Sequence, residues 1–262
     1  MKRNYILIAV LLLSTIIYSC KKNAVQDISS PISGAQIKFF NFGLNSPVVN
    51  FYANNTKVSA ASSTTGTESA TTGVAFAAVY PATNAYAIIT PGTYDLKAKR
   101  PSTSTVDPDQ VIASISSTLA DGKNYSLYTS GLYNTTTKTT DVFVVEDALP
   151  AIDSSAAYVR FVHACYNANA FTFIMKNTTT GIETVVAPSV SYKSASAFFR
   201  IPTGVYDLIL RYPSAPTTNV VVRTAVSVIK SNTYSFSLRG DITLPYTGSA
   251  TNRPFIDNTP NR

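Results

Sequence analysis

An internal repeat constrains the fold of this chain more than any other feature of its sequence. The stretch PGTYDLKAKRPS at Pro91–Ser102 returns as PTGVYDLILRYPS at Pro202–Ser214. Upstream of each stretch, AQIKFFNFGL from Ala35 corresponds to AYVRFVHACY from Ala157. The landmarks keep their order while their spacing drifts, as in a duplicated domain with loop insertions. The sequence therefore predicts two copies of one domain.

Apolar and polar residues alternate within each copy, as in Tyr94 and Leu96, which flank Asp95. A period of two is typical of half-buried strands. The runs are rich in Val, Ile, Thr, Tyr and Phe, clusters of turn residues separate them, and none shows a convincing helical spacing. We therefore expect an all-β protein of two tandem immunoglobulin-like or transthyretin-like β-sandwich domains, each with about seven strands.

The repeat also sets the expected domain boundaries. We expect the first sandwich over residues 32–147 and the second over residues 156–245, followed by a C-terminal extension over residues 246–262. Residues 148–155 between the copies contain proline, aspartate and two serines, which is typical of a linker. The Ser/Thr-rich stretch at 59–73 occurs only in the first copy, and its low complexity indicates a loop expansion.

The repeated motif itself has a structural interpretation. In the first copy Pro91 presets the backbone for a turn, and Gly92 can adopt a positive φ. The chain would then enter a strand whose Tyr94 faces the core, with Tyr206 in the same place in the second copy. A turn and core side chains explain the repeated Tyr-Asp pair without a ligand.

The N-terminus has the pattern of an export signal. A positively charged start precedes an apolar stretch over residues 5–17, which is shorter than the about 20 residues of a membrane-spanning helix. The Cys20 that follows resembles the lipidated cysteine of the lipobox in bacterial lipoproteins. The resemblance implies a signal peptide over 1–19 and a lipidated Cys20 that begins a tether over 20–31. The alternative is an ordinary cleaved signal with an incidental cysteine.

Lipidation would fix the location of the protein. The two or three acyl chains on such a cysteine hold a protein on a membrane almost permanently. We therefore expect the protein in the cell envelope, attached to the outer membrane through its lipid. The formal net charge of +7 is dispersed along the chain, without the clustered basic face of a nucleic-acid surface, so nucleic acid is not an expected partner.

The candidate chemistry is sparse. His163 is the single histidine, and Cys165, the one cysteine besides Cys20, lies two residues later, on the same face of a strand. A nearby imidazole could stabilise a thiolate, which makes the two residues a possible polar site. The favoured alternative places both side chains in the core beside Val159 and Phe161.

We expect no metal site and no cofactor. A structural zinc site needs three or four nitrogen or sulfur ligands, and His163 and Cys165 are only two. Asp107 and Asp109 could help to hold Ca²⁺, but a turn explains them better. No sequence fingerprint for nucleotide or dinucleotide binding is present.

Three tyrosines in or near expected loops are possible ligand contacts: Tyr133, Tyr166 and Tyr246. Tyrosine rings stack on sugars and anchor protein interfaces. The possible partners are therefore a glycan or another envelope protein.

The strand RFVHACYNAN resembles the start of the extracytoplasmic β-domains catalogued as domain of unknown function 4397, which have a pattern like V-H-A-S-P-D-A-P. Val162–Ala164 match this pattern, whereas Cys165–Asn167 replace its Ser, Pro and Asp. The resemblance covers nearly all of residues 32–244. It implies tandem sandwiches on envelope proteins, often lipoproteins of Gram-negative bacteria, and no assigned activity.

These observations predict a membrane-anchored, non-catalytic envelope lipoprotein with a role in binding or adhesion. The alternative is a structural spacer or an accessory subunit of an envelope protein complex. An enzyme is not expected.

Overall fold

The computed structural model describes residues 33–59, 72–82 and 85–262. These residues form strands, turns and loops, and none of them belongs to a helix that could cross a membrane. The predicted signal peptide, Cys20, the tether and most of the loop at 59–73 lie outside the described residues.

The first sandwich is built from two sheets with the strand orders β4-β1-β8-β9 and β3-β2-β6-β7, and β5 also pairs with β1. Its strands are β1 (Ala35–Asn41), β2 (Asn50–Ala53), β3 (Thr56–Lys57), β4 (Ala78–Tyr80), β5 (Ala87–Ile89), β6 (Gly92–Lys99), β7 (Val111–Leu119), β8 (Asn124–Asn134) and β9 (Thr139–Glu146).

The second sandwich repeats this arrangement, with the strand orders β13-β10-β17-β18 and β12-β11-β15-β16, and with β14 also paired to β10. Its strands are β10 (Ala156–His163), β11 (Phe171–Asn177), β12 (Glu183–Val190), β13 (Ser194–Ala195), β14 (Phe199–Pro202), β15 (Gly204–Arg211), β16 (Val221–Val228), β17 (Thr233–Arg239) and β18 (Phe255–Pro260).

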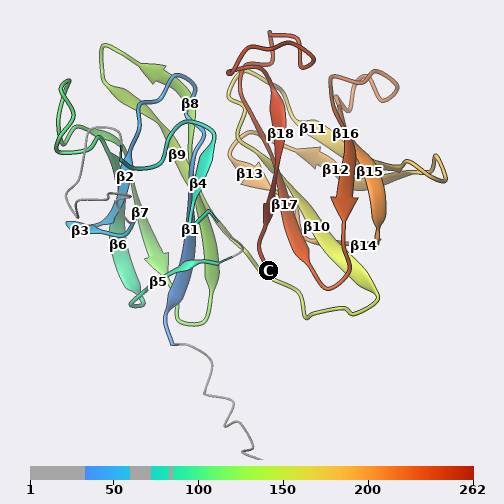
Figure 1. The fold of residues 1–262 in the computed structure, drawn as a ribbon, viewed down its shortest axis with the longest axis horizontal. Coiled ribbons are helices and arrows are strands. Elements are labelled where there is room, and N and C mark those ends of the chain that lie inside the picture. The colour runs from blue at the N-terminus through green and yellow to red at the C-terminus, as the bar shows by residue number, and fades with distance from the viewer. Residues whose placement is uncertain (1–32, 60–71, 83–84) are drawn as a thin grey trace, which may run out of the picture. The chain divides into compact units, whose positions relative to one another are not determined.

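The two sandwiches match strand for strand, which confirms the predicted all-β duplication (Figure 1). In each copy the first strand pairs in parallel with a late strand, β1 with β8 and β10 with β17. Lys38 is paired with Ser126 in the first copy, as Arg160 is with Ser235 in the second. Lys38 and Arg160 are therefore equivalent, as are the two serines, and the register extends this equivalence along each strand.

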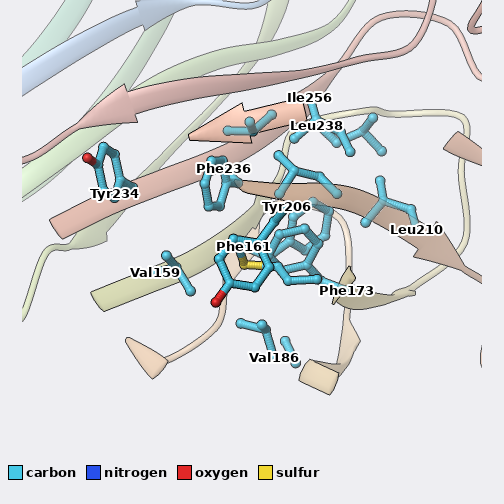
Figure 2. Close-up of a cluster of buried hydrophobic side chains, with 14 of the residues drawn as sticks. Val159, Phe161, Phe173, Val186, Tyr206, Leu210, Tyr234, Phe236, Leu238 and Ile256 are labelled. Atoms are coloured by element: carbon cyan, nitrogen blue, oxygen red, sulfur yellow. The ribbon is translucent and has the colours of Figure 1, made fainter. Parts of the chain in front are cut away.

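Each sandwich has its own apolar core, formed by the inward faces of its two sheets. Figure 2 shows the second core, where Phe161 of β10, Phe173 of β11 and Phe236 of β17 lie together. The rings of Phe161 and Phe173 stack with centroids 5.2 Å apart. In the first core Phe39 stacks on Phe51 in the same way, at 4.8 Å.

The repeated tyrosines occupy equivalent positions, and each closes a local hydrogen bond. The Tyr94 hydroxyl donates to the Thr90 carbonyl at 2.7 Å, and the Tyr206 hydroxyl donates to the Pro202 carbonyl at 2.8 Å. The expectation of a positive φ at Gly92 is wrong, because this residue begins β6 outside that conformational region. A Cβ at Gly92 would meet the Tyr94 ring at an ordinary 3.5 Å, whereas at Gly204 it would lie 3.1 Å from the Asn177 side chain and 3.2 Å from the Tyr206 ring.

The C-terminal segment is more than an extension of the second sandwich. Within the expected extension at 246–262, residues Phe255–Pro260 form β18, which pairs antiparallel with β17. Ile256 of this strand is fully buried in the second core. A long connection of 15 residues separates β17 from β18. Because of this length, the spacing of strands along the sequence does not predict β18.

Four central strands, β1, β8, β10 and β17, are buried on both faces. Residues in or directly after β1, β8, β9 and β10 form a third apolar cluster, to which the first sandwich contributes Phe40, Phe42, Tyr128 and Phe143, and the second contributes Val162 and Ala164. The five-stranded sheets of the two copies are thus in contact. The period of two predicts strands that are buried on one face only, and this expectation is wrong for the strands at this interface.

Candidate functional site

A buried ion pair joins the two sandwiches. The Arg160 guanidinium on β10 contacts the Asp147 carboxylate just after β9, and both side chains are at most 2% exposed. Arg160 also donates to the Ser235 hydroxyl at 2.8 Å and to the Glu146 carbonyl at 3.2 Å. A second oxygen of Asp147 accepts from Ser126 at 2.7 Å. A buried charge pair is stable only when such additional hydrogen bonds satisfy its remaining atoms.

The equivalent residues make the reciprocal contact. Lys38 occupies in β1 the position of Arg160 in β10, and its ammonium group donates to the carbonyl of Pro260 at 2.7 Å. Pro260 ends β18 as Glu146 ends β9, since they pair with the equivalent Tyr234 and Tyr125. Each sandwich thus directs one cation to the last strand of the other. Burial lowers the pKa of Lys38 to about 8, although the Asp147 carboxylate opposes this shift.

The structure places the predicted pair His163 and Cys165 in the interior of the second sandwich. Both side chains are fully buried. The backbone N–H of Cys165 donates to Nδ1 of His163 at 3.3 Å, so Nε2 carries the proton and donates to the Asn169 carbonyl at 3.0 Å. The Cys165 thiol donates to the Gly240 carbonyl at 3.1 Å. Burial raises the pKa of this thiol to about 12 and lowers that of His163, so neither group is charged at neutral pH.

The first sandwich shows what His163 does. Asn41 holds the equivalent position in β1, and its side-chain amide donates to the Pro47 carbonyl at 3.0 Å. Pro47 and Asn169 each lie six residues after the polar side chain that binds them. An amide and an imidazole thus anchor the same loop in the two copies, which is a structural role.

The three predicted tyrosines are divided between the two sandwiches. Tyr133 packs against the core of the first sandwich, and Tyr246 packs against that of the second. Tyr166 is half-buried in the loop after β10. The carbonyl of Tyr246 accepts a hydrogen bond from Arg253 at 2.6 Å, which links this tyrosine to a pocket that sequence analysis did not predict.

The duplication creates two equivalent junctions between the sandwiches, and one of them is closed. Tyr192, just before β13, shares a hydrogen bond with Ser130 of β8 at 2.9 Å and donates to Asp141 of β9 at 3.0 Å. Lys193 pairs with the same carboxylate at 3.0 Å. The hydroxyl, carboxylate and ammonium groups of these residues thus form hydrogen bonds and an ion pair with one another rather than with a ligand.

At the other junction, different residues occupy the positions of Tyr192, Lys193, Ser130 and Asp141. Register aligns Phe76 with Tyr192, Ala77 with Lys193, Arg239 with Ser130 and Phe255 with Asp141. Ala77 and Lys193 also share a positive φ, of 68° and 62°, and each donates its N–H to the equivalent strand carbonyl.

This second junction is open. A pocket of about 470 Å³ is lined by Phe76 and Ala77 of the first sandwich and by Arg239, Arg253 and Phe255 of the second. The guanidinium groups of Arg239 and Arg253 lie 5.4 and 4.9 Å from the centroid of the Phe255 ring. Arg239 also lies 5.3 Å from the ring of Phe76. The sequence carries no signal for this site, because its residues are far apart in the chain and share no motif.

The two aspartates considered as calcium ligands, Asp107 and Asp109, lie in ion pairs. Asp107 contacts Lys138, and Asp109 pairs with Lys99 at 3.1 Å. Both aspartates have positive φ values, as residues in tight turns do. Within the described part of the chain, no group of three or more His, Cys, Asp or Glu side chains is placed to hold a metal ion.

Comparison with known proteins identifies the family. The model of a domain of unknown function, DUF4397, matches residues 35–174 and 157–260. The chain belongs to this family. The two overlapping matches correspond to the tandem copies, which confirms the resemblance seen in the sequence.

The similarity of the chain to solved structures is weak. The chain is similar to the TIE protein of Bacillus anthracis at 15% identity and a TM-score of 0.25, over 80% of this chain and 34% of that one. It is similar to a leucine-rich repeat protein from Bacteroides thetaiotaomicron at 11% identity and a TM-score of 0.20, over 84% of this chain and 26% of that one. The chain thus spans about a third or less of these proteins, and no curated protein matches it.

Proposed function

We propose that this DUF4397 protein is a non-catalytic lipoprotein of the cell envelope that binds a ligand with its paired sandwiches. Lipid on Cys20 would attach it to the outer membrane, and the compact unit from Gly34 to Arg262 would present the binding surface. The observation that carries the binding role is the open junction, where Arg239, Arg253 and two phenylalanines surround a pocket.

Two further observations support a non-catalytic role. The thiol of Cys165, the only cysteine among the described residues, is buried and remains protonated at neutral pH. His163 anchors a loop as Asn41 does in the other copy. A nucleophilic cysteine needs a lowered thiol pKa and access to its substrate, and Cys165 has neither.

Lipid attachment is tested with the full chain in a Gram-negative host. We expect the parent protein to fractionate with the outer membrane and to incorporate an alkyne-labelled palmitate, and the Cys20→Ser variant to lose the label and become soluble. A variant that stays in the membrane fraction as firmly as the parent would contradict the anchor.

Binding is tested with the soluble segment Ala24–Arg262, which contains every strand described above. We expect saturable binding to a polysaccharide or protein fraction purified from the envelope. Tyr246→Ala should weaken this binding, because the Tyr246 ring packs against the second core and its carbonyl holds Arg253, which lines the pocket. Tyr133→Ala, on the first sandwich, serves as a matched control. If no fraction binds saturably, the binding role is wrong.

The alternative role is that of a structural spacer or accessory subunit, and the extensive interface between the sandwiches favours it. Arg160, Asp147 and the aromatic cluster join the copies into one packed unit, which suits a spacer. A spacer should co-purify with a defined envelope complex and tolerate Tyr246→Ala. Retention of that complex by Tyr246→Ala, without any saturable ligand, would favour the spacer over the binding protein.

A further inference from the structure

The open junction has an excess of positive charge around one aromatic ring. Three guanidinium groups, those of Arg223, Arg239 and Arg253, lie within 5.4 Å of the centroid of Phe255. One carboxylate, that of Asp257, pairs with Arg239 at 2.6 Å. Arg223 donates to the Ile256 carbonyl at 2.6 Å, and the same Asp257 carboxylate acts on its guanidinium group, so two of the three cations share one carboxylate. A concave site with this charge balance attracts an anion.

The two arginines that line the pocket keep unused hydrogen-bond donors. Arg253 donates Nη1 to the Tyr246 carbonyl at 2.6 Å, and among the described residues its Nε and Nη2 have no acceptor. Arg239 donates Nε and Nη2 to Asp257, at 2.6 and 3.5 Å, and its Nη1 has no acceptor in the same set of residues. The Nε and Nη2 of a guanidinium form a planar fork that matches the two oxygens of a carboxylate.

The closed junction shows which group is missing from the open one. There, Asp141 supplies a carboxylate to Tyr192 at 3.0 Å and to Lys193 at 3.0 Å. Its equivalent in the open junction is Phe255, so the carboxylate is lost while positive charge remains on Arg239 and Arg253. A carboxylate brought by a ligand would take the chemical role that Asp141 has in the closed junction.

The rest of the pocket is apolar, and its volume fits more than a simple ion. Phe76, Ala77 and Phe255 form most of the apolar lining, and Ser249 and Thr251 add hydroxyl groups from the β17–β18 connection. A volume of about 470 Å³ is in the range of sites for small organic molecules. The body of the ligand is therefore a ring or a short chain rather than a bare anion.

We propose that the open junction binds an organic carboxylate, with its anionic group on the Arg253 fork and Arg239 and its ring or chain body against Phe76 and Phe255. This inference rests on the binding role proposed above and names the chemistry of the ligand. The carboxylate can come from an acidic sugar, such as the uronic acid of a polysaccharide, or from an aromatic acid, and the test separates the two.

The test uses isothermal titration calorimetry with the segment Ala24–Arg262 in a buffer without phosphate or carboxylate. The probes are trigalacturonate, its neutral methyl ester, benzoate, benzyl alcohol and inorganic phosphate. We expect one of the two carboxylates to bind saturably at least tenfold tighter than its neutral counterpart and than phosphate, and the probe that binds identifies the source.

Variants assign the binding to the pocket. We expect Arg253→Gln to weaken carboxylate binding at least tenfold, and Arg253→Lys to weaken it less, since it keeps the charge and loses the fork. Phe76→Ala, on the other sandwich, should also weaken it without touching the loop that Arg253 stabilises. Lys230→Gln removes one exposed positive charge elsewhere and should change nothing.

Three outcomes would overturn the inference: no carboxylate binds, the neutral counterparts or phosphate bind as well, or Arg253→Gln and Phe76→Ala both bind like the parent. Unchanged circular dichroism and unfolding curves show that a variant is folded. If the carboxylates fail while an envelope fraction still binds saturably, the proposed function stands and only the ligand chemistry is wrong. If neither binds, both proposals fail.

Discussion

The two sandwiches share one topology, but their contacting faces have diverged in opposite directions. The first copy presents Phe40, Phe42 and Tyr128, where the second has Val162, Ala164 and Ser237. Large rings thus pack against small side chains, and the stacked rings of Phe40 and Tyr128, 4.2 Å apart, fill the space that the second copy leaves. Duplication therefore produced two complementary surfaces rather than two identical ones.

The same divergence separates the two junctions. One became a closed set of hydrogen bonds around Asp141, and the other became a pocket with two arginines. The charged residues of the interface differ in the same way, since Arg160 is paired with Asp147 while Lys38 faces a carbonyl. Variants at equivalent positions can measure how far the copies have diverged.

The largest expected effect is on the chemistry of Cys165, whose equivalent in the first copy is Gly43. Because burial raises the thiol pKa to about 12, we expect the native thiol to react with iodoacetamide about a thousandfold more slowly than the unfolded chain at pH 8. Mass spectrometry of the Cys20→Ser variant, native and in guanidinium, measures both rates. Equal rates would show that the thiol is exposed in the native state.

Replacement of Arg160, the cation that is paired with Asp147, should lower the free energy of unfolding the most. Arg160→Met leaves the Asp147 carboxylate buried without its partner, so we expect the free energy of unfolding to fall by about 3–5 kcal/mol. Lys38→Met at the equivalent position should change it by less than about 2 kcal/mol, since burial already disfavours the charged lysine. Denaturation in urea measures both. Similar losses in the two variants would contradict the asymmetry.

The aromatic face of the first sandwich should contribute more to stability than the facing surface of the second sandwich. Phe40→Ala removes a fully buried ring that stacks on Tyr128, and we expect a loss of about 3 kcal/mol or more. Val162→Ala at the equivalent position removes a smaller buried side chain, and about half that loss is expected. Thermal unfolding of both variants makes the comparison, and a larger loss at Val162 would refute it.

The smallest expected effect is a pH dependence due to Lys38. Its pKa of about 8 in the folded protein lies below the unfolded value of about 10.4, so the unfolded chain binds more protons between these pH values. Stability from this residue is therefore lowest below pH 8 and rises toward pH 10. From pH 7.5 to 9.5 we expect the parent to gain about 1 kcal/mol relative to Lys38→Met. No change in this difference would show that the lysine is not buried as a cation.

Sequence patterns were sufficient to predict the strands but not the interface between the two sandwiches. Alternation marked strands such as β6, where Leu96 and Ala98 face the core. Phe39, Phe40 and Phe42 carried a signal that the period of two misses, because adjacent apolar residues are typical of a strand covered on both faces. The burial of Lys38 and Arg160 had no such signal, since a lysine and an arginine in a strand ordinarily face solvent.

The sequence by itself determined the duplication and the all-β class, because repeated landmarks and side-chain alternation are local properties of the chain. Only the tertiary structure decided that β18 completes the second sandwich, that His163 anchors a loop, and that Phe76 lies beside Arg239. The first two outcomes depend on contacts within the second sandwich, across a 15-residue connection and within one loop. The third joins residues more than a hundred positions apart on the two copies, and no local pattern specifies it.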